Sequence, residues 1–316
     1  MQRTLVMVLC VALLTGCAGS GTTQSDAAKP FAARAALVLD GQSGEYVDWA
    51  TLVLAAADAD VVFIGEMHGH KKGLAVAAAL WEDIVASAQT AGRDPALSME
   101  FFERDQQVGL DDYLTGVTDE AAFRKATNRT EGNYPPGHRA MIETAKATGA
   151  RVYAANAPRR YSSKARSEGF ADLQALRASQ QRLFVIPRDM PVGAYKDRFF
   201  ELMAGMMAAH AEDGADEIDE TEKQSMLESF FRAQSVWDAT MADTICTALA
   251  AGRAPVVHVV GQFHADREGG TVARVRQRWP RAAIVTISMS ESEGDMLIAD
   301  DRERALFVIP VGPSSE

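Results

Sequence analysis

The sequence is short of the residues and motifs that mark several protein classes. It has only 3 cysteines in 316 residues, too few for a disulfide framework. Basic residues are outnumbered, with 32 Lys and Arg against 43 Asp and Glu, for a formal net charge of -11. Because binding to a phosphate backbone requires clustered basic side chains, nucleic acid is excluded as the main partner. A Gly-rich phosphate loop, a dinucleotide fingerprint and a nucleophile elbow are also lacking.

The N-terminus has the pattern of a secretory signal. Arg3 is followed by an apolar run to Leu14 and a small-residue junction before Cys17. This run is too short to span a bilayer as a mature helix. Its end, Leu-Thr-Gly-Cys, resembles a bacterial lipobox, in which Cys17 carries lipid; an ordinary secretory signal cleaved elsewhere is the alternative. We expect residues 1–16 to be a lipoprotein signal peptide and residues 17–30 to be the lipidated cysteine with a flexible tether.

The lipobox also predicts a location. Ala18, directly after the cysteine, does not match the usual pattern that retains bacterial lipoproteins at the inner membrane. We therefore expect an outer membrane lipoprotein on the periplasmic or surface side, in contact with the membrane through its lipid anchor. Residues 31–316 would form the folded domain.

The pattern of apolar residues in that domain predicts an α/β fold. Continuous apolar runs are typical of strands covered on both faces, and they occur at Ala36–Leu39, Val61–Ile64, Ala96–Met99, Val152–Ala155, Val256–Val260, Ile284–Ile287 and Leu306–Ile309. Residues 74–88 and 227–249 have helical periodicity. We predict a mostly parallel sheet flanked by helices. The helix-rich stretches 105–142 and 157–228 predict a helical cap over the carboxyl ends of the strands, with a separate small domain as the alternative.

Two Gly-x-x-His segments follow predicted strands. Glu66 and His68 come after the strand that ends near Gly65, and His264 comes after the strand that ends near Gly261. Ligands of α/β sheets bind at the carboxyl ends of the strands, so both imidazoles are expected in one crevice. Imidazole at such a place suits metal ligation, haem contact or acid–base chemistry. The alternative is that each histidine only caps a turn.

Other strand ends add polar candidates. Glu100 ends the third predicted strand, and with Glu66, His68 and His264 it forms a ligand set suited to zinc or manganese. Three further candidates, Asn156, Arg159 and Arg160, follow the fourth strand, where an arginine would bind a carboxylate of a ligand or hold a site glutamate in place. His70, next to two lysines, is expected to be solvated.

An ordered series of motifs resembles a known family. The series consists of Gly65–His68, Met99-Glu100 followed by Asp105–Gln107, Tyr134–Pro136, Asn156–Arg159, Ala233-Gln234, Asp238–Ala242 and Gly261–His264. Together these motifs resemble the ChaN-like haem-binding lipoproteins of the Tiki superfamily, over about residues 58–277. The lipobox agrees with this resemblance, because members of the family are typically tethered to the surface for iron uptake.

The resemblance implies a haem-binding protein in which two haems stack between paired subunits and a tyrosine ligates the iron. It therefore implies haem as cofactor and a homodimer. The possible haem contacts are Tyr134, His138, Tyr161 and Arg160, and the residues leave Tyr113, Tyr153 and Tyr195 open as further tyrosine ligands.

The wider superfamily also implies an alternative function. It includes proteins that resemble metal-dependent peptidases and erythromycin esterases, in which the paired Gly-x-x-His segments and the strand-end glutamate form the reactive site. A haem carrier with a tyrosine ligand has no evident use for these residues. The alternative is therefore a metal-dependent hydrolase of an ester or peptide, with Glu66 as general base and a divalent metal such as zinc or manganese.

Overall fold

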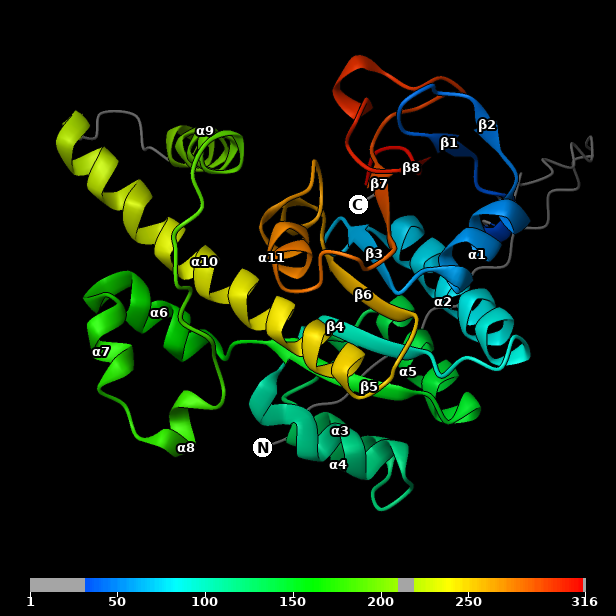
Figure 1. Ribbon diagram of the computed structural model, residues 1–316, viewed down its shortest axis with the longest axis horizontal. Helices are drawn as coiled ribbons and strands as arrows, with labels where there is room; N and C mark the ends of the chain where they lie inside the picture. Colours follow the sequence, from blue (N-terminus) through cyan, green and yellow to red (C-terminus); the bar gives the residue numbers. More distant parts are fainter. Residues whose placement is uncertain (1–31, 210–218, 315–316) are drawn as a thin grey trace, which may run out of the picture. The chain divides into compact units, whose positions relative to one another are not determined.

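An eight-stranded sheet forms the centre of the fold (Figure 1). Its spatial order is β2-β1-β8-β7-β3-β6-β4-β5, and the strands are β1 (Val38–Asp40), β2 (Tyr46–Val47), β3 (Val61–Glu66), β4 (Ala96–Glu103), β5 (Arg151–Asn156), β6 (Val256–Gly261), β7 (Ile284–Ser290) and β8 (Phe307–Pro310). The six strands from β8 to β5 are parallel, whereas β1 pairs antiparallel with both β8 and β2. The carboxyl ends of β3, β4, β5 and β6 therefore lie at one edge of the sheet.

The computed structural model describes residues 32–209 and 219–314, which belong to one compact unit. Its α-helices are α1 (Trp49–Asp58), α2 (Lys71–Thr90), α3 (Gln107–Leu114), α4 (Glu120–Ala126), α5 (Pro136–Thr148), α6 (Arg159–Glu168), α7 (Phe170–Gln174), α8 (Ala178–Gln181), α9 (Ala194–Ala209), α10 (Glu220–Ala250) and α11 (Gly270–Arg278). No helix in the described ranges is long and apolar enough to cross a membrane. The predicted signal peptide, Cys17 and the tether lie outside these ranges.

Helices cover both faces of the sheet. Alternate residues of β3 belong to different cores: Val62 and Ile64 pack with α1, α2 and α5, and Val61 and Phe63 pack with α10 and α11. A strand that is buried on both faces has no polar side to present, which explains its continuous apolar run. The predicted α/β class and mostly parallel sheet are confirmed.

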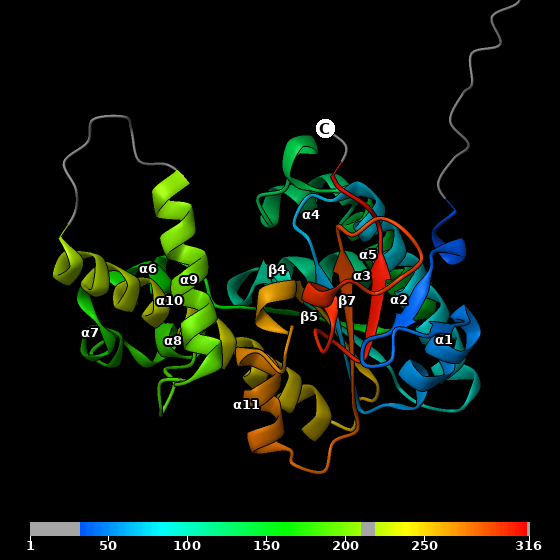
Figure 2. The ribbon, with the colours of Figure 1, turned by 90° about the horizontal axis from the view of Figure 1, so that it is seen from above.

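The remaining helices extend the fold beyond the sheet. Both ribbon views place α6–α9 and the first half of α10 away from α1, α2 and α5 (Figures 1 and 2). The second half of α10 instead packs on β4, β5 and β6, so one helix links the cap to the sheet. Within the predicted cap stretch 105–142, α5 belongs to the flanking layer, because it packs on α2 and the indole of Trp81 donates to the carbonyl of Met141 (3.1 Å).

Candidate functional site

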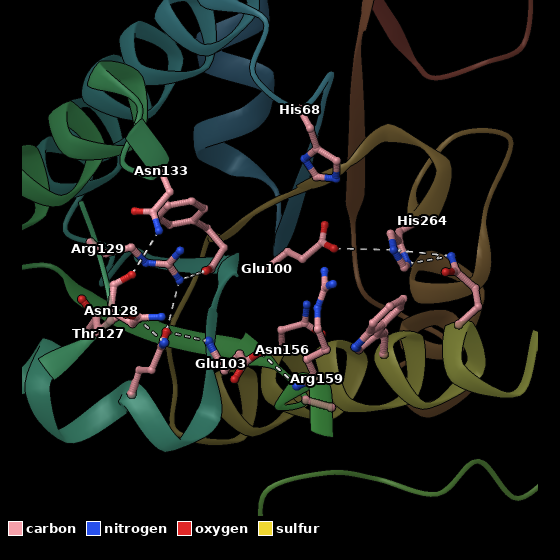
Figure 3. Close-up of a pocket in the computed structure, with 15 residues that line it drawn as sticks. His68, Glu100, Glu103, Thr127, Asn128, Arg129, Asn133, Asn156, Arg159 and His264 are labelled. Atoms are coloured by element: carbon pink, nitrogen blue, oxygen red, sulfur yellow. Dashed lines mark hydrogen bonds and ion pairs between the residues drawn. The ribbon is translucent and has the colours of Figure 1, made fainter. Parts of the chain in front are cut away.

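A cavity of about 550 Å³ opens at the carboxyl ends of the strands (Figure 3). Its walls come from the β3–α2 loop, β4, the segment after α4, the end of β5, α10 and the turn after β6. Most of its side chains are polar, and the lining is His68, Glu100, Phe101, Glu103, Gln106, Thr127, Asn128, Arg129, Asn133, Asn156, Ala157, Arg159, Gln234, Trp237 and His264. The two predicted imidazoles thus share one cavity, although about two hundred residues separate them.

The carboxylate of Glu66 bridges two imidazoles and orients the ring of His68. The last residue of β3, Glu66, is buried, and its two carboxylate oxygens lie 3.1 Å from His68 Nδ1 and 2.7 Å from His138 Nε2. Burial alone would raise the pKa of Glu66, but the hydrogen bonds from the two imidazoles lower it to about 2. The same contact raises the pKa of His68. Glu66 therefore remains ionised, orients the ring through Nδ1 and leaves His68 Nε2 free for a ligand.

Glycine at position 261 makes room for this ring. A Cβ atom at Gly261 would lie 2.8 Å from His68 Nε2 and 3.4 Å from Glu100 Oε2, so any other residue would displace the imidazole. The backbone N–H of Gly261 donates to the same Glu100 oxygen at 2.7 Å. The end of β6 therefore holds Glu100 and lets His68 lie close to it. The side chain of His68 is 70% exposed, so its free nitrogen is accessible from the cavity.

His264 is a buried imidazole held between two carboxylates. Its Nδ1 lies 2.7 Å from Oδ1 of Asp238 on α10, and its Nε2 lies 3.7 Å from Glu100 Oε1. Burial would lower the pKa of His264, but the negative charges of Glu100 and Asp238 raise it to about 9. Asp238 is fully buried and also accepts from the hydroxyls of Tyr195 (2.7 Å) and Thr271 (2.8 Å). The two carboxylates therefore favour the imidazolium form of His264 and hold the ring at the edge of the cavity.

The four predicted metal ligands do not form one group. Glu66 does not line the cavity, because both of its oxygens are turned toward His68 and His138. Among the residues that the structure describes, no three or more His, Cys, Asp and Glu side chains are placed to hold a metal ion. The predicted set of Glu66, His68, Glu100 and His264 is therefore corrected. Glu66 positions His68, while Glu100 and His264 interact with each other.

Of the three polar candidates that follow the fourth predicted strand, two line the cavity and one does not. Asn156 and Arg159 line the cavity, and the backbone N–H of Arg159 donates to Glu103 (2.9 Å). Arg160 does not line it; its guanidinium forms an ion pair with Asp105 (2.7 Å).

None of the possible tyrosine ligands reaches this cavity. Tyr134 and Tyr161 are buried in apolar cores, and the hydroxyl of Tyr134 finds no hydrogen-bond partner among the described residues. Tyr195 is bound to Asp238, and burial raises its pKa well above the ordinary value. Tyr113 is buried against Glu143, and the partly exposed Tyr153 lines a different pocket. His138 is also buried, with its ring against Phe101.

Sequence reasoning missed Arg129 and Asp238. Arg129 follows α4 in a segment with no strand or Gly-x-x-His pattern, and nothing in the sequence marks it. Asp238 belongs to a motif that carried the family resemblance, but its contact with His264 depends on how α10 packs. The available signal was a carboxylate among the mostly apolar side chains of a long helix, a residue type that is seldom buried without a partner.

Comparisons with known proteins agree with the resemblance. The model of the family described as "Haem-binding uptake, Tiki superfamily, ChaN" matches residues 52–275. The structure of ChaN of Campylobacter jejuni, described with cofacial heme binding, has a TM-score of 0.65 at 15% identity, covering 87% of this chain and 96% of that one. At this identity the likeness shows the fold alone. No curated protein matches the sequence.

Two more distant structures share part of the architecture. The type III effector HopBA1 is 16% identical with a TM-score of 0.45, covering 90% of this chain and 99% of its own. A variant of the erythromycin esterase EreC in its open conformation is 11% identical with a TM-score of 0.45, covering 87% and 83%. Neither is similar enough to support an argument about function. The family model spans well over half of the chain, and the protein therefore belongs to the haem-binding uptake family of the Tiki superfamily, the family of ChaN.

Proposed function

We propose that the protein is a lipid-anchored haem-binding protein of bacterial iron uptake, and that haem enters the cavity at the carboxyl ends of the strands. The observation that carries the proposal is the match to the haem-binding uptake family over residues 52–275. The cavity supports it with an exposed imidazole, and its volume of about 550 Å³ lies within the range of small-molecule and cofactor pockets.

The residues present fit histidine ligation better than tyrosine ligation. Histidines that bind metals usually donate the other ring N–H to a carboxylate, which fixes the ring and strengthens the ligand. His68 has this arrangement, because Nδ1 contacts Glu66 and Nε2 is free. We therefore assign His68 as the residue that would hold the haem iron. The raised pKa of His68 adds a condition, since the ring ligates iron only after it loses its proton.

The anchor and the assembly are separate parts of the proposal. The lipobox at Cys17 supports attachment to the outer membrane, on the periplasmic or surface side. Replacing the cysteine, Cys17→Ser, should release the protein from the membrane fraction of expressing bacteria. The family supports a homodimer around paired haems, which predicts that hemin increases the mass measured by light scattering.

A hemin titration of the full-length protein in detergent tests the haem proposal. We expect saturable binding with a shifted Soret band, lost or weakened about tenfold or more in His68→Ala. The matched control is Tyr46→Phe, which alters an exposed tyrosine of β2 outside the cavity and should leave binding unchanged. Absence of a Soret shift in the wild type contradicts haem binding. Unchanged hemin affinity in His68→Ala contradicts the assigned ligand.

A second candidate function is hydrolysis of an ester or peptide in the same cavity. The specific observation is the ordered imidazole–carboxylate pair His68–Glu66, next to the imidazolium of His264. His68 would accept a proton from an attacking water, with Glu66 stabilising the charged ring, and His264 would stabilise negative charge on the substrate. We expect ester hydrolysis that increases as pH rises through the pKa of His68. Equal rates for the wild type and His68→Ala on p-nitrophenyl acetate would contradict this candidate.

A further inference from the structure

One wall of the cavity contains an arginine that forms no ion pair with any residue the structure describes. The guanidinium of Arg129 stacks on the ring of Phe101, 3.9 Å from its centroid. One of its terminal nitrogens donates to the backbone carbonyl of Phe101 (2.5 Å) and, at 3.3 Å, to the side-chain oxygen of Gln106. No ion pair joins Arg129 to an acid anywhere in the described ranges. Arg129 is half-buried, and charged groups that are partly withdrawn from water are usually paired, so this arrangement points to a partner supplied by a ligand.

The Nε atom of Arg129 also lacks a partner among the described residues. It is buried, and no described residue accepts a hydrogen bond from it. Burial lowers the pKa of Arg129, and the negative charge of Glu103 offsets this only in part. A guanidinium has five N–H groups in a planar fork, and the hydrogen bonds of Arg129 to Phe101 and Gln106 both come from one terminal nitrogen. A negatively charged oxygen of a ligand in the cavity would accept from the other terminal nitrogen.

Arg159 provides a second guanidinium in the same cavity. Figure 3 shows its side chain extending toward Glu100, and no ion pair holds it to any described residue. Glu103 is an acidic residue that lines the same cavity. Its side chain accepts from the backbone N–H of Arg159 and takes part in a capping box with Gln106. The carboxylate of Glu103 is therefore bound to main-chain donors and leaves both arginines free to bind a ligand.

We propose that Arg129 and Arg159 form an oxyanion subsite of the cavity that binds a carboxylate or phosphate group of the ligand. Arg129 matches this task because its stacking on Phe101 fixes the plane of the guanidinium before the ligand arrives. This part of the proposal rests on the proposed haem function: when the ligand is haem, the carboxylate bound by the subsite is a haem propionate. A free small oxyanion is the other source of the same chemistry.

Hemin and hemin dimethyl ester distinguish these sources, because the ester lacks the propionate charges. We expect the full-length protein to bind hemin about tenfold more tightly than the ester. Arg129→Met should remove most of this preference and leave affinity for the ester unchanged, and Arg129→Lys should restore part of it. The control Arg281→Met changes an exposed arginine outside the cavity and should behave as the wild type. Equal weakening of both ligands in Arg129→Met would show a structural role and overturn the proposal.

Inorganic phosphate tests the subsite without haem. At matched ionic strength, phosphate in place of chloride should raise the melting temperature of the wild type and of Arg281→Met, but not of Arg129→Met. If hemin fails to bind while this pattern is observed, the haem function is wrong and the subsite stands with a free oxyanion as ligand. If hemin and its ester bind with equal affinity and phosphate does not raise the melting temperature, the subsite proposal is wrong, and the haem function is not affected by that result.

Discussion

The contact between Asp238 and His264 makes a prediction about stability that can be worked out from the structure. In the folded protein the pKa of His264 is raised from 6.5 to about 9. A histidine with a raised folded-state pKa contributes stability that is complete below pH 6.5 and is lost as pH rises through about 9. The shift corresponds to about 3 kcal/mol at about 1.4 kcal/mol per pKa unit.

The substitution Asp238→Asn tests this coupling. It keeps the shape of the side chain but removes one of the two charges that raise the pKa of His264. We expect destabilisation of about 3–5 kcal/mol near pH 6, where the buried imidazolium would keep only Glu100 as a charged partner. The destabilisation should shrink by up to about 3 kcal/mol toward pH 10, because the wild type also loses its ion pair there.

Urea unfolding followed by circular dichroism from pH 6 to 10 measures this difference at each pH. Comparing variant with wild type cancels the titration of groups that both share. Asp243→Asn is the control, since Asp243 lies on the same helix, contacts Arg104 and Arg278, and has a lowered pKa that does not titrate in this window. A destabilisation by Asp238→Asn that stays constant with pH would refute the reasoning.

Three further predictions concern single positions. Gly261→Ala should displace the His68 ring, because the new methyl group would lie 2.8 Å from its Nε2 atom. We expect hemin binding about tenfold weaker and an unfolding free energy changed by less than about 1 kcal/mol. Unchanged hemin affinity would contradict the role of Gly261 in making room for the ring. Tyr134→Phe should be neutral or stabilising by up to about 1 kcal/mol in urea unfolding, because it removes a buried hydroxyl without a partner, and a clear loss would argue against that placement. His70→Ala should cost about 2 kcal/mol in the same assay, since this side chain caps α2 and contacts the carbonyl of Gly312 at 2.9 Å; a cost near zero would contradict both roles.

The sequence predicts the fold well where burial controls the pattern. All seven apolar runs are strands, and residues 74–88 and 227–249 lie within α2 and α10. The two-residue strand β2 was missed, because its exposed Tyr46 and half-buried Val47 form no apolar run. The antiparallel pairing of β1 with β2 and β8 could not be predicted either, since the residues of a three-residue strand do not encode which strands it pairs with or in which direction.

The site shows where reasoning from sequence stops. His68 and His264 were predictable partners, because strand ends meet at one edge of a parallel sheet. His70 was wrongly expected in solvent; it is 2% exposed, and adjacent lysines say little about a residue that caps a helix. The role of Glu66 depends on His138, which α5 brings to it across 72 positions. No local pattern encodes such a contact.

Resonance Raman spectroscopy of the hemin-loaded protein tests the central claim most directly, that His68 at the strand ends holds the haem iron. The account predicts a spectrum of nitrogen ligation in the wild type that is lost in His68→Ala and retained in Tyr153→Phe, a change at the half-buried tyrosine of β5. A phenolate–iron vibration that persists in His68→Ala and disappears on replacing a tyrosine would contradict it.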